Sequence, residues 1–381
     1  MYVSSWPGLT AREFYRSRSN RSFPFLLNAD NRLAFCVARS GIYHLFRALR
    51  FKKGDVVLVP DYHSGNEVFA IRAAGASIVY YPILRNLEPD MEALSGLAKL
   101  NPRAIYVIHY LGWPQPMKDI EALCRERGSL LIEDCALSLL SETDQGPLGS
   151  FGDYSVFCLY KTLPVPNGGL LVQNRNILGE LANLELERCP HTAAAGRGSE
   201  LVLEAVRSRS DNIGKVLFGI KRSFGQMLRA ARVRQVPVGN IGWNVADVNI
   251  AMSSISQTVM GGLEYDQIRR KRRENFLLMQ HRLEGRVTML RNDLKEGVCP
   301  LFFPILVEDK HAAARALWQR GIGAVEFWNE GDPQADGQSG SDARYLRAHV
   351  LELPIHQDVT PSQVEYIAEQ VLRLELEPAQ C

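Results

Sequence analysis

The sequence predicts an α/β protein with a large unit, built on a mostly parallel central sheet, and a small C-terminal α+β unit. Three observations favour this fold. Short apolar runs rich in β-branched residues recur through residues 33–175, segments with helical spacing separate the first of these runs, and a second, smaller set of helix and strand patterns begins near residue 248. The 381 residues, 46% hydrophobic and 23% charged, have ordinary globular composition, which excludes disordered and collagen-like chains.

The central sheet is predicted from six apolar runs. Each run is apolar on both faces, which is typical of a strand that helices cover on both sides. Helical patterns at residues 64–74, 91–100 and 117–127 separate the first four runs. A spacing of about 25 residues between strands suits right-handed strand–helix–strand crossovers. The six predicted strands are residues 56–59, 77–81, 104–108, 130–132, 154–157 and 170–172.

The large domain is predicted to span residues 1–247 and to include a basic helical insertion at about residues 190–236. Basic residues outnumber acidic ones in this insertion, and apolar residues recur there at helical spacing. One interpretation is a basic amphipathic surface for an anionic substrate, a neighbouring subunit or peripheral contact with a membrane. The simpler and favoured interpretation is a helical insertion with a solvated basic face.

The small α+β domain is assigned to residues 248–381, where helix and strand patterns follow one another after the basic insertion. A stretch rich in Gly, Asp, Gln and Ser is expected to form a loop within it. The predicted elements are a long helix at 248–283, a strand at 301–307, a helix at 310–320, the loop at 331–341 and a last helix at 361–374.

Charge and cysteine content narrow the classes of partner and compartment. Lys and Arg number 44 and Asp and Glu 42, a net charge of +2, so nucleic acid is not an expected partner. The seven cysteines are scattered without a Cys-x-x-Cys pair, which argues against a zinc site or disulfide framework and favours a reducing compartment. We find no signal-peptide pattern and no run of ~18 apolar residues, so we expect no transmembrane segment and a cytoplasmic location.

The strongest chemical signal is a carboxylate and an amine at the ends of two predicted strands. Asp134 follows the run 130–132, and Lys161 follows the run 154–157. Because the carboxyl ends of parallel strands face the ligand crevice, the two groups should converge there. The pair suits pyridoxal phosphate, which needs a lysine amine for a Schiff base and a carboxylate that keeps its ring nitrogen protonated. On spacing alone, a strand-end cap and a surface lysine are the favoured interpretation.

The context of these two residues reverses that preference. Lys161 lies between a strand and a loop rich in proline and glycine, which leads into the strand at 170–172. Upstream, Ala38-Arg39-Ser40-Gly41 precedes a helix-like segment at 42–49, whose free N-terminal amides would bind a phosphate. A helix cap by Ser40 is compatible with the same geometry.

At these motifs the chain resembles the DegT/DnrJ/StrS family of fold-type I, pyridoxal-phosphate-dependent sugar aminotransferases. The resemblance covers nearly the whole chain, and its specificity comes from the order and spacing of the motifs. They are residues 54–60 (GDVVLVP), 109–114 (HYLGWP), 133–136 (EDCA), the lysine loop ending in Gly168-Gly169, residues 242–244 (GWN) and 353–356 (LPIH).

The resemblance implies a homodimer that moves an amino group, from glutamate, to a keto group of a nucleotide-linked sugar or related polyol. It implies that Lys161 is the Schiff-base lysine and proton carrier and that Asp134 is the partner of the pyridinium nitrogen. It also implies no metal. The resemblance further implies that Ala38, Arg39, Ser40 and Ser155 contact the cofactor's phosphate and that Tyr62 or His63 covers the face of its ring. It implies flanking contacts with the cofactor from Ala136 and Leu137. It also implies that Asn244 contacts the cofactor of the other subunit.

Three positions depart from the family pattern. Leu137 stands where the family usually has Gln, Val156 stands where it has Ser, and Ala246 stands where it has Arg. Two alternatives therefore stay open: an enzyme of the same family with a lipid-linked or other non-nucleotide substrate, and a catalytically weak relative that binds pyridoxal phosphate and regulates. For both Tyr62 and His63, a place in the core is an equal alternative to stacking on the cofactor. The family members that dehydrate sugars have histidine at the lysine position, so Lys161 argues against that branch.

Overall fold

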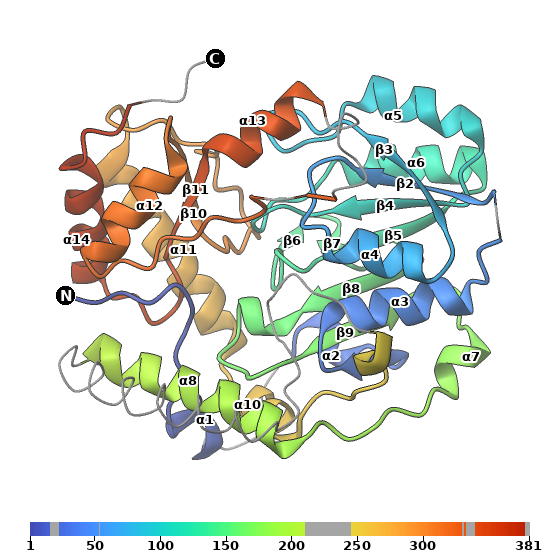
Figure 1. Ribbon diagram of the computed structural model, residues 1–381, viewed down its shortest axis with the longest axis horizontal. Helices are drawn as coiled ribbons and strands as arrows, with labels where there is room; N and C mark the ends of the chain where they lie inside the picture. The colour runs from blue at the N-terminus through green and yellow to red at the C-terminus, as the bar shows by residue number, and fades with distance from the viewer. Residues whose placement is uncertain (16–22, 53, 210–244, 330, 333–339, 378–381) are drawn as a thin grey trace.

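A seven-stranded sheet organises the large unit of this computed structural model, which describes residues 1–15, 23–52, 54–209, 245–329, 331–332 and 340–377. The strand order is β1-β9-β8-β5-β4-β2-β3, and β9 is antiparallel to both of its neighbours while the other pairs are parallel. The predicted mostly parallel α/β fold is thus confirmed (Figure 1). The strands are β1 (Arg32–Phe35), β2 (Val56–Pro60), β3 (Ser77–Tyr81), β4 (Ala104–Ile108), β5 (Leu130–Asp134), β8 (Tyr154–Cys158) and β9 (Gly169–Gln173).

Helices cover both sides of this sheet. The helices α3 (Ala38–Ala48) and α4 (Asn66–Ala73) pack on one side, and α5 (Met91–Leu97) and α6 (Met117–Arg127) pack on the other (Figure 1). Strands β4, β8 and β9 are buried along their whole length. Burial on both faces explains why these strands read as continuous apolar runs.

The C-terminal unit is built around a two-stranded antiparallel sheet of β10 (Phe303–Leu306) and β11 (Val350–Leu353). Around it lie α11 (Tyr265–Leu283), α12 (Lys310–Gln319), α13 (Ser341–His349) and α14 (Pro361–Leu372) (Figure 1). Thr360 and Gln363 form a capping box at the start of α14, with Pro361 in the first turn. Buried side chains of both units form one contiguous apolar core.

The prediction of one long helix at residues 248–283 is wrong, because the structure has two separate helices in this range. Ala251 pairs with Phe35 in an isolated bridge, α10 occupies Ser254–Gly262, and α11 starts only at Tyr265. Leu263 takes an extended conformation between the two helices. The backbone of Gly262 lies against the carbonyl oxygen of Glu13, where any side chain would collide, so this position at the end of α10 requires glycine.

The N-terminal segment of the chain packs against the C-terminal unit. Val3 pairs with Ile322, and its amide and carbonyl bond to Gly321 and Gly323. Residues 1–5 therefore pack against the unit that follows residue 262, and the division at 247 and 248 stays a prediction. The remaining elements are the helix α8 (His191–Arg209) and the short elements α1 (Arg12–Tyr15), α2 (Phe25–Asn28), η1 (Ala98–Leu100), β6 (Glu142–Thr143), β7 (Gly146–Pro147), η2 (Leu159–Lys161), α7 (Gly179–Ala182) and η3 (Val245–Asp247).

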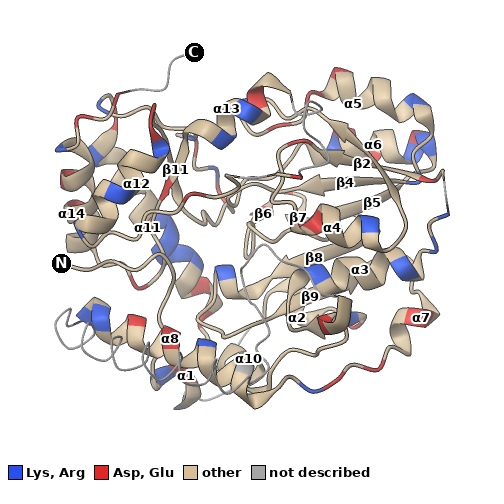
Figure 2. Cartoon of the chain, in the orientation of Figure 1, with Lys and Arg blue, Asp and Glu red and all other residues tan. Residues whose placement is uncertain are grey.

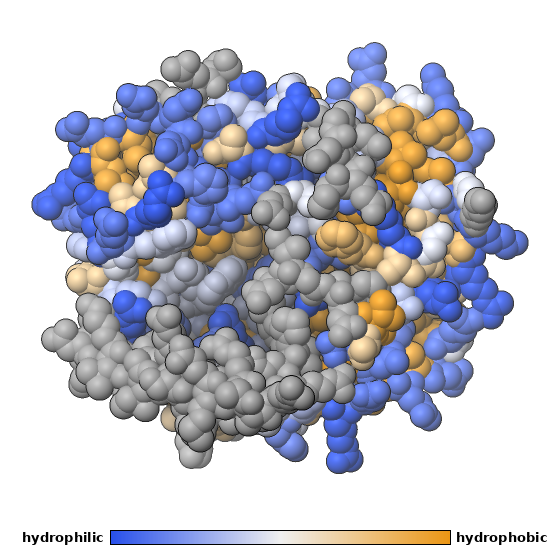
Figure 3. All heavy atoms as spheres, in the orientation of Figure 1, coloured by the Kyte–Doolittle hydropathy of each residue, from blue (hydrophilic) through white to orange (hydrophobic). Residues whose placement is uncertain are grey.

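Charged side chains of both signs are interspersed over the described chain (Figure 2). On the face shown in Figure 3, hydrophilic side chains surround scattered hydrophobic patches. The first part of the predicted basic insertion forms α8, whereas its remainder, residues 210–236, lies outside the described residues. Within the described ranges, no helix combines the length and apolarity needed to cross a membrane.

Candidate active site

A cavity of about 360 Å³ opens at the carboxyl ends of the parallel strands. The large unit supplies most of its wall, and the segment 326–329 of the C-terminal unit supplies the rest. Six predicted site residues meet there, namely Ala38, Arg39, Asp134, Ala136, Leu137 and Lys161. The other lining residues are Val37, Ile42, Ser64, Asn66, Glu67, Ile108, Cys158, Tyr160, Glu326, Phe327, Trp328 and Asn329.

Asp134 ends β5 with a carboxylate that is 5% exposed. Its Oδ2 accepts a hydrogen bond from the Tyr106 hydroxyl over 2.6 Å, and its Oδ1 accepts one from the Ala136 amide over 2.8 Å. Burial raises the pKa of Asp134 to about 6, and the neighbouring Glu67 carboxylate acts in the same direction. The site therefore holds an anion that lacks enough positive charge nearby, which suits a cationic ligand group.

Lys161 lies at the end of η2, directly after β8, and its side chain reaches the same cavity as Asp134. Its Nζ lies 5.6 Å from the centroid of the Phe327 ring. Its positive charge acts to lower the pKa of Asp134, although burial outweighs this effect. The structure thus brings together the amine and the carboxylate that the sequence predicted.

The N-terminus of α3 forms another part of the wall. Val37, Ala38 and Arg39 line the cavity, and Val37 precedes the helix without a side-chain cap. The first amides of a helix have no partner inside the helix, so they can bind an anionic group. A side chain at Gly169 would collide with the backbone of Ala38, which explains the glycine at the end of the lysine loop.

Two residues expected at the phosphate lie outside the cavity wall. Ser40 and Ser155 are both buried, and the Ser155 hydroxyl has no hydrogen-bond partner within the described chain. On β8, it is Cys158 that lines the cavity. The contact predicted between the Ser155 hydroxyl and the phosphate stays a prediction.

Tyr62 and His63 also lie outside the wall of this cavity. Tyr62 packs against Tyr110 and Trp328, with ring centroids 5.5 and 4.8 Å apart, and His63 stacks on Tyr80 at 5.3 Å. Burial lowers the pKa of His63 to about 4. Both side chains are buried in this structure, and stacking of either one on the cofactor stays a prediction. The aromatic residues that do line the cavity are Tyr160, Phe327 and Trp328.

Glu67 is a cavity residue that the sequence analysis did not single out. Its carboxylate is almost fully buried and accepts hydrogen bonds from the Ser64 amide, over 2.7 Å, and from the Ser64 hydroxyl. The spacing Ser-x-x-Glu before a helix is a capping-box pattern, and this pattern is the one feature of the local sequence that points to Glu67. It predicts the contact with Ser64, but it does not predict that Glu67 faces Asp134 across a cavity.

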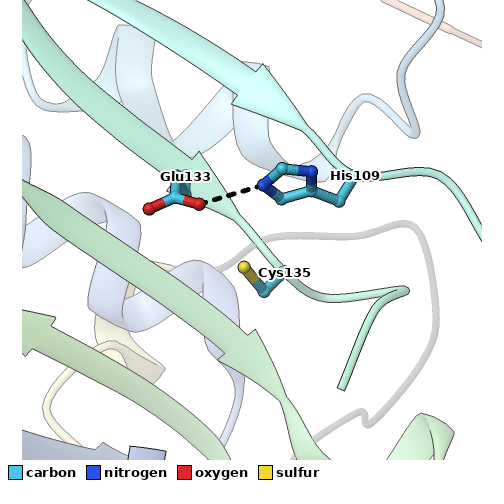
Figure 4. Close-up of side chains that lie close together, drawn as sticks. All are labelled: His109, Glu133 and Cys135. Carbon is cyan, nitrogen blue, oxygen red and sulfur yellow. Dashed lines mark hydrogen bonds and ion pairs between the residues drawn. The ribbon is translucent and has the colours of Figure 1, made fainter. Parts of the chain in front are cut away.

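A second buried group, shown in Figure 4, consists of His109, Glu133 and Cys135. The His109 Nδ1 accepts a hydrogen bond from the Gln115 amide, so Nε2 carries the proton and donates it to Glu133 over 3.0 Å. The same carboxylate accepts three more hydrogen bonds, from the amides of Gly149, Phe151 and Gly152. Because these atoms are already paired, we assign the group to fixing the end of β5 and not to binding a metal.

Residues 16–198 match the sequence profile of the DegT/DnrJ/EryC1/StrS aminotransferase family. This part of the chain, just under half of its length, is thus similar to that family. Two similar curated members are GDP-perosamine synthases: that of Vibrio cholerae is 27% identical over 178 residues, which cover 46% of this chain and 48% of the relative. That of Escherichia coli O157:H7 is 30% identical over 154 residues, which cover 39% and 40%. The matches thus span about half of the relatives' length or less.

Solved structures of aminotransferases share the fold over almost the whole chain. Helicobacter pylori PseC, an aminotransferase of pseudaminic acid biosynthesis, gives a TM-score of 0.66 at 18% identity and covers 98% of both chains. The aminotransferase TlmJ from Streptoalloteichus hindustanus gives a TM-score of 0.66 at 21% identity, covering 97% of this chain and 92% of its own. The fold-type I architecture that the motifs implied is thereby confirmed.

One family position falls outside the described residues. Asn244, with Gly242 and Trp243, lies in the range 210–244, so its expected contact with the other subunit's cofactor stays a prediction. Leu137, which replaces the usual Gln of this family, is buried and lines the cavity. Its apolar side chain offers no hydrogen bond to a ligand there.

Proposed function

We propose that this protein is a pyridoxal-phosphate-dependent aminotransferase that moves an amino group, from glutamate, to a keto group of a nucleotide-linked sugar or related polyol. The observation that carries the proposal is the convergence of Lys161, Asp134 and the N-terminus of α3 on one cavity. An amine, a buried carboxylate and an anion-binding helix end are the groups that this cofactor requires.

The residues of the cavity fit the cofactor. Asp134 would hold the protonated ring nitrogen, and burial of its carboxylate away from water strengthens that ion pair. The amides of Ala38 and Arg39 would bind the phosphate. Ala136 and Leu137 would contact the ring or its substituents, since both line the cavity just beyond Asp134.

When bound, pyridoxal phosphate supplies an aldehyde that combines with amines and an aromatic ring that accepts electrons. Lys161 would hold this aldehyde group, and its Nζ would carry a proton to and from the substrate carbon. Asp134 would keep the proton on the ring nitrogen. Phe327 and Trp328 exclude water from the side of the cavity that the C-terminal unit closes.

The acceptor is proposed from the relatives, which are named for nucleotide-linked sugars. Leu137 favours a second candidate, a lipid-linked or other non-nucleotide keto-sugar, because an apolar side chain replaces a usual polar contact. We also propose a homodimer with shared sites, in which Asn244 reaches the partner's cofactor.

The experiment that tests the proposal is an amino-transfer assay with purified protein, pyridoxal phosphate and L-glutamate. Nucleotide-linked, lipid-linked and free keto-sugars are compared, and both 2-oxoglutarate and the amino-sugar are measured by mass spectrometry. Equal yields of the two products with a nucleotide-linked acceptor would support the first candidate. Cofactor binding without transfer to any acceptor would contradict the proposed activity and support the regulatory alternative.

A further inference from the structure

The cavity wall supplied by the C-terminal unit has an unusual backbone conformation. Trp328 has a φ of 54°, in the left-handed region that bulky side chains rarely adopt. Such a conformation persists only when surrounding contacts enforce it, and it is found preferentially at functional sites. One contact that holds this backbone is a hydrogen bond to the Trp328 carbonyl from an arginine outside the cavity.

Arg347, on α13, donates hydrogen bonds to three backbone carbonyls from two separate segments. Its Nη1 donates to the carbonyls of Trp328 and His63, each over 2.9 Å, and its Nη2 donates to that of Asp61 over 3.0 Å. Its guanidinium carbon also lies 5.4 Å from the centroid of the Tyr62 ring. Arg347 thus joins the loop after β2 to the cavity wall.

The side chains of the wall are fixed around this junction. The Trp328 ring packs edge-on against Tyr62 and Tyr110, at 4.8 and 5.5 Å. The Phe327 amide donates to the buried Glu352 carboxylate over 3.2 Å. Without Arg347, however, the Trp328 carbonyl would lose the charged donor that connects it to the large unit.

A second contact anchors the chain just beyond the wall. Asp332 accepts a hydrogen bond from the Tyr80 hydroxyl over 2.7 Å and forms an ion pair with Arg72. These anchors fix the segment at residue 332. The Phe327 ring packs against Trp6 and Phe302, with ring centroids 6.0 and 5.5 Å apart, whereas the Trp328 carbonyl is joined to the large unit through Arg347.

We infer that Arg347 is a positioning residue that holds Phe327 and Trp328 as the acceptor-facing wall of the cavity. The inference concerning the acceptor rests on the proposed function, whereas the inference concerning the wall does not. A planar guanidinium can serve several carbonyls in fixed directions, and an ammonium on a flexible chain cannot do so equally well. Lysine at this position should therefore replace Arg347 only in part.

Hydrogen–deuterium exchange of the cofactor-free protein tests the wall directly. In Arg347→Met, amides of residues 326–329 should exchange about tenfold faster or more than in the wild type, since fewer contacts oppose local opening. Arg347→Lys should give a smaller increase, and it also serves if the methionine variant fails to fold. Arg344→Met, an exposed position on the same helix, is the matched control and should leave this exchange unchanged. Unchanged exchange in both Arg347 variants would overturn the inference.

Kinetics of the cofactor-loaded protein test the link to the acceptor. Arg347→Lys should raise the KM for the keto-sugar by about tenfold or more, because a displaced wall misplaces the substrate. Cofactor affinity should change by less than about threefold, because Asp134, Lys161 and α3 keep their contacts. Faster exchange with an unchanged KM would overturn the acceptor role alone. If the wild type aminates no acceptor, the proposed function fails, and the exchange result still decides the role of Arg347 in the wall.

Discussion

The hydroxyl of Tyr106 donates a hydrogen bond to Asp134 Oδ2 over 2.6 Å at the bottom of the cavity. Tyr106 is fully buried on β4, and Asp134 ends the neighbouring strand β5. The two strands pair in parallel with Ile108 beside Asp134, so the tyrosine lies two residues before the strand ends. This contact fixes the direction of the carboxylate, and the Ala136 amide fixes its other oxygen. A carboxylate fixed in this way need not reorganise when a cation binds.

Replacement of Lys161 by alanine should abolish covalent attachment of the cofactor. Borohydride reduction of wild-type protein loaded with pyridoxal phosphate should add the mass of the reduced cofactor to residue 161, because only a lysine bonded to the aldehyde is trapped. Peptide mass spectrometry measures the attachment. Lys99→Ala, at an exposed position, is the control and should keep it. Trapping in Lys161→Ala would show that another amine binds the aldehyde.

Replacement of Asp134 by asparagine should lower turnover by orders of magnitude while the protein stays folded. The amide keeps the size of the side chain but removes the negative charge that holds the ring nitrogen protonated. Folding raises the pKa of Asp134 from its ordinary 3.8 to about 6, so stability falls as the pH rises between these two values, and the full cost of the buried anion is present above about pH 6. Urea unfolding at pH 7 should therefore find the cofactor-free variant at least as stable as the wild type. An unchanged turnover would place the ring nitrogen elsewhere.

Replacement of Glu67 by glutamine should shift the acid limit of cofactor binding to lower pH. Asp134 faces Tyr106 from β4, Glu67 from α4, Cys158 from β8 and Lys161 from η2, and it adjoins Cys135. Burial and Glu67 raise its pKa to about 6, so below that pH it becomes neutral and cofactor affinity should fall. Without the Glu67 charge the pKa should decrease, which moves this fall to a lower pH.

Titration of cofactor absorbance between pH 5 and about 8 measures this limit, and the range covers the expected titration of Asp134. Glu326→Gln removes another carboxylate from the same cavity wall and is the matched control. It should leave the limit in place, because Glu326 is not among the groups that shift the pKa of Asp134. Equal shifts in both variants would contradict a specific effect of Glu67.

Replacement of His109 by alanine should lower the free energy of unfolding by about 1–3 kcal/mol, because the buried Glu133 carboxylate loses a donor. Urea unfolding measures the change. His281→Ala, at an exposed position on α11, is the control and should be nearly neutral. A destabilised protein that still binds the cofactor would agree with a structural role for this group. Stoichiometric zinc binding by the wild type that is lost in His109→Ala would instead indicate a metal site.

The sequence by itself determined the central sheet and the two chemical groups at its edge. The runs at β2, β3, β4, β5, β8 and β9 are apolar on both faces. A strand that is covered on both sides needs apolar residues at successive positions, so its local sequence alone reveals it. Asp134 and Lys161 follow two of these strands directly, so the parallel arrangement was enough to place them together. Strand β1 was not predicted. Its first residue, Arg32, is exposed, and the burial of the other residues of the strand depends on contacts with β9 and α3.

Only the tertiary structure decided what surrounds these groups. Glu67 carries a local capping signal, but its place opposite Asp134 follows from how α4 packs on the sheet. Phe327 and Trp328 stand far along the chain, and no local pattern shows that they line the cavity or that Arg347 binds the Trp328 carbonyl. Conversely, Tyr62 and His63 follow β2 in sequence but turn into the core. The physical reason is that a strand fixes where its end lies, whereas the direction of a side chain in the following loop depends on contacts with distant segments.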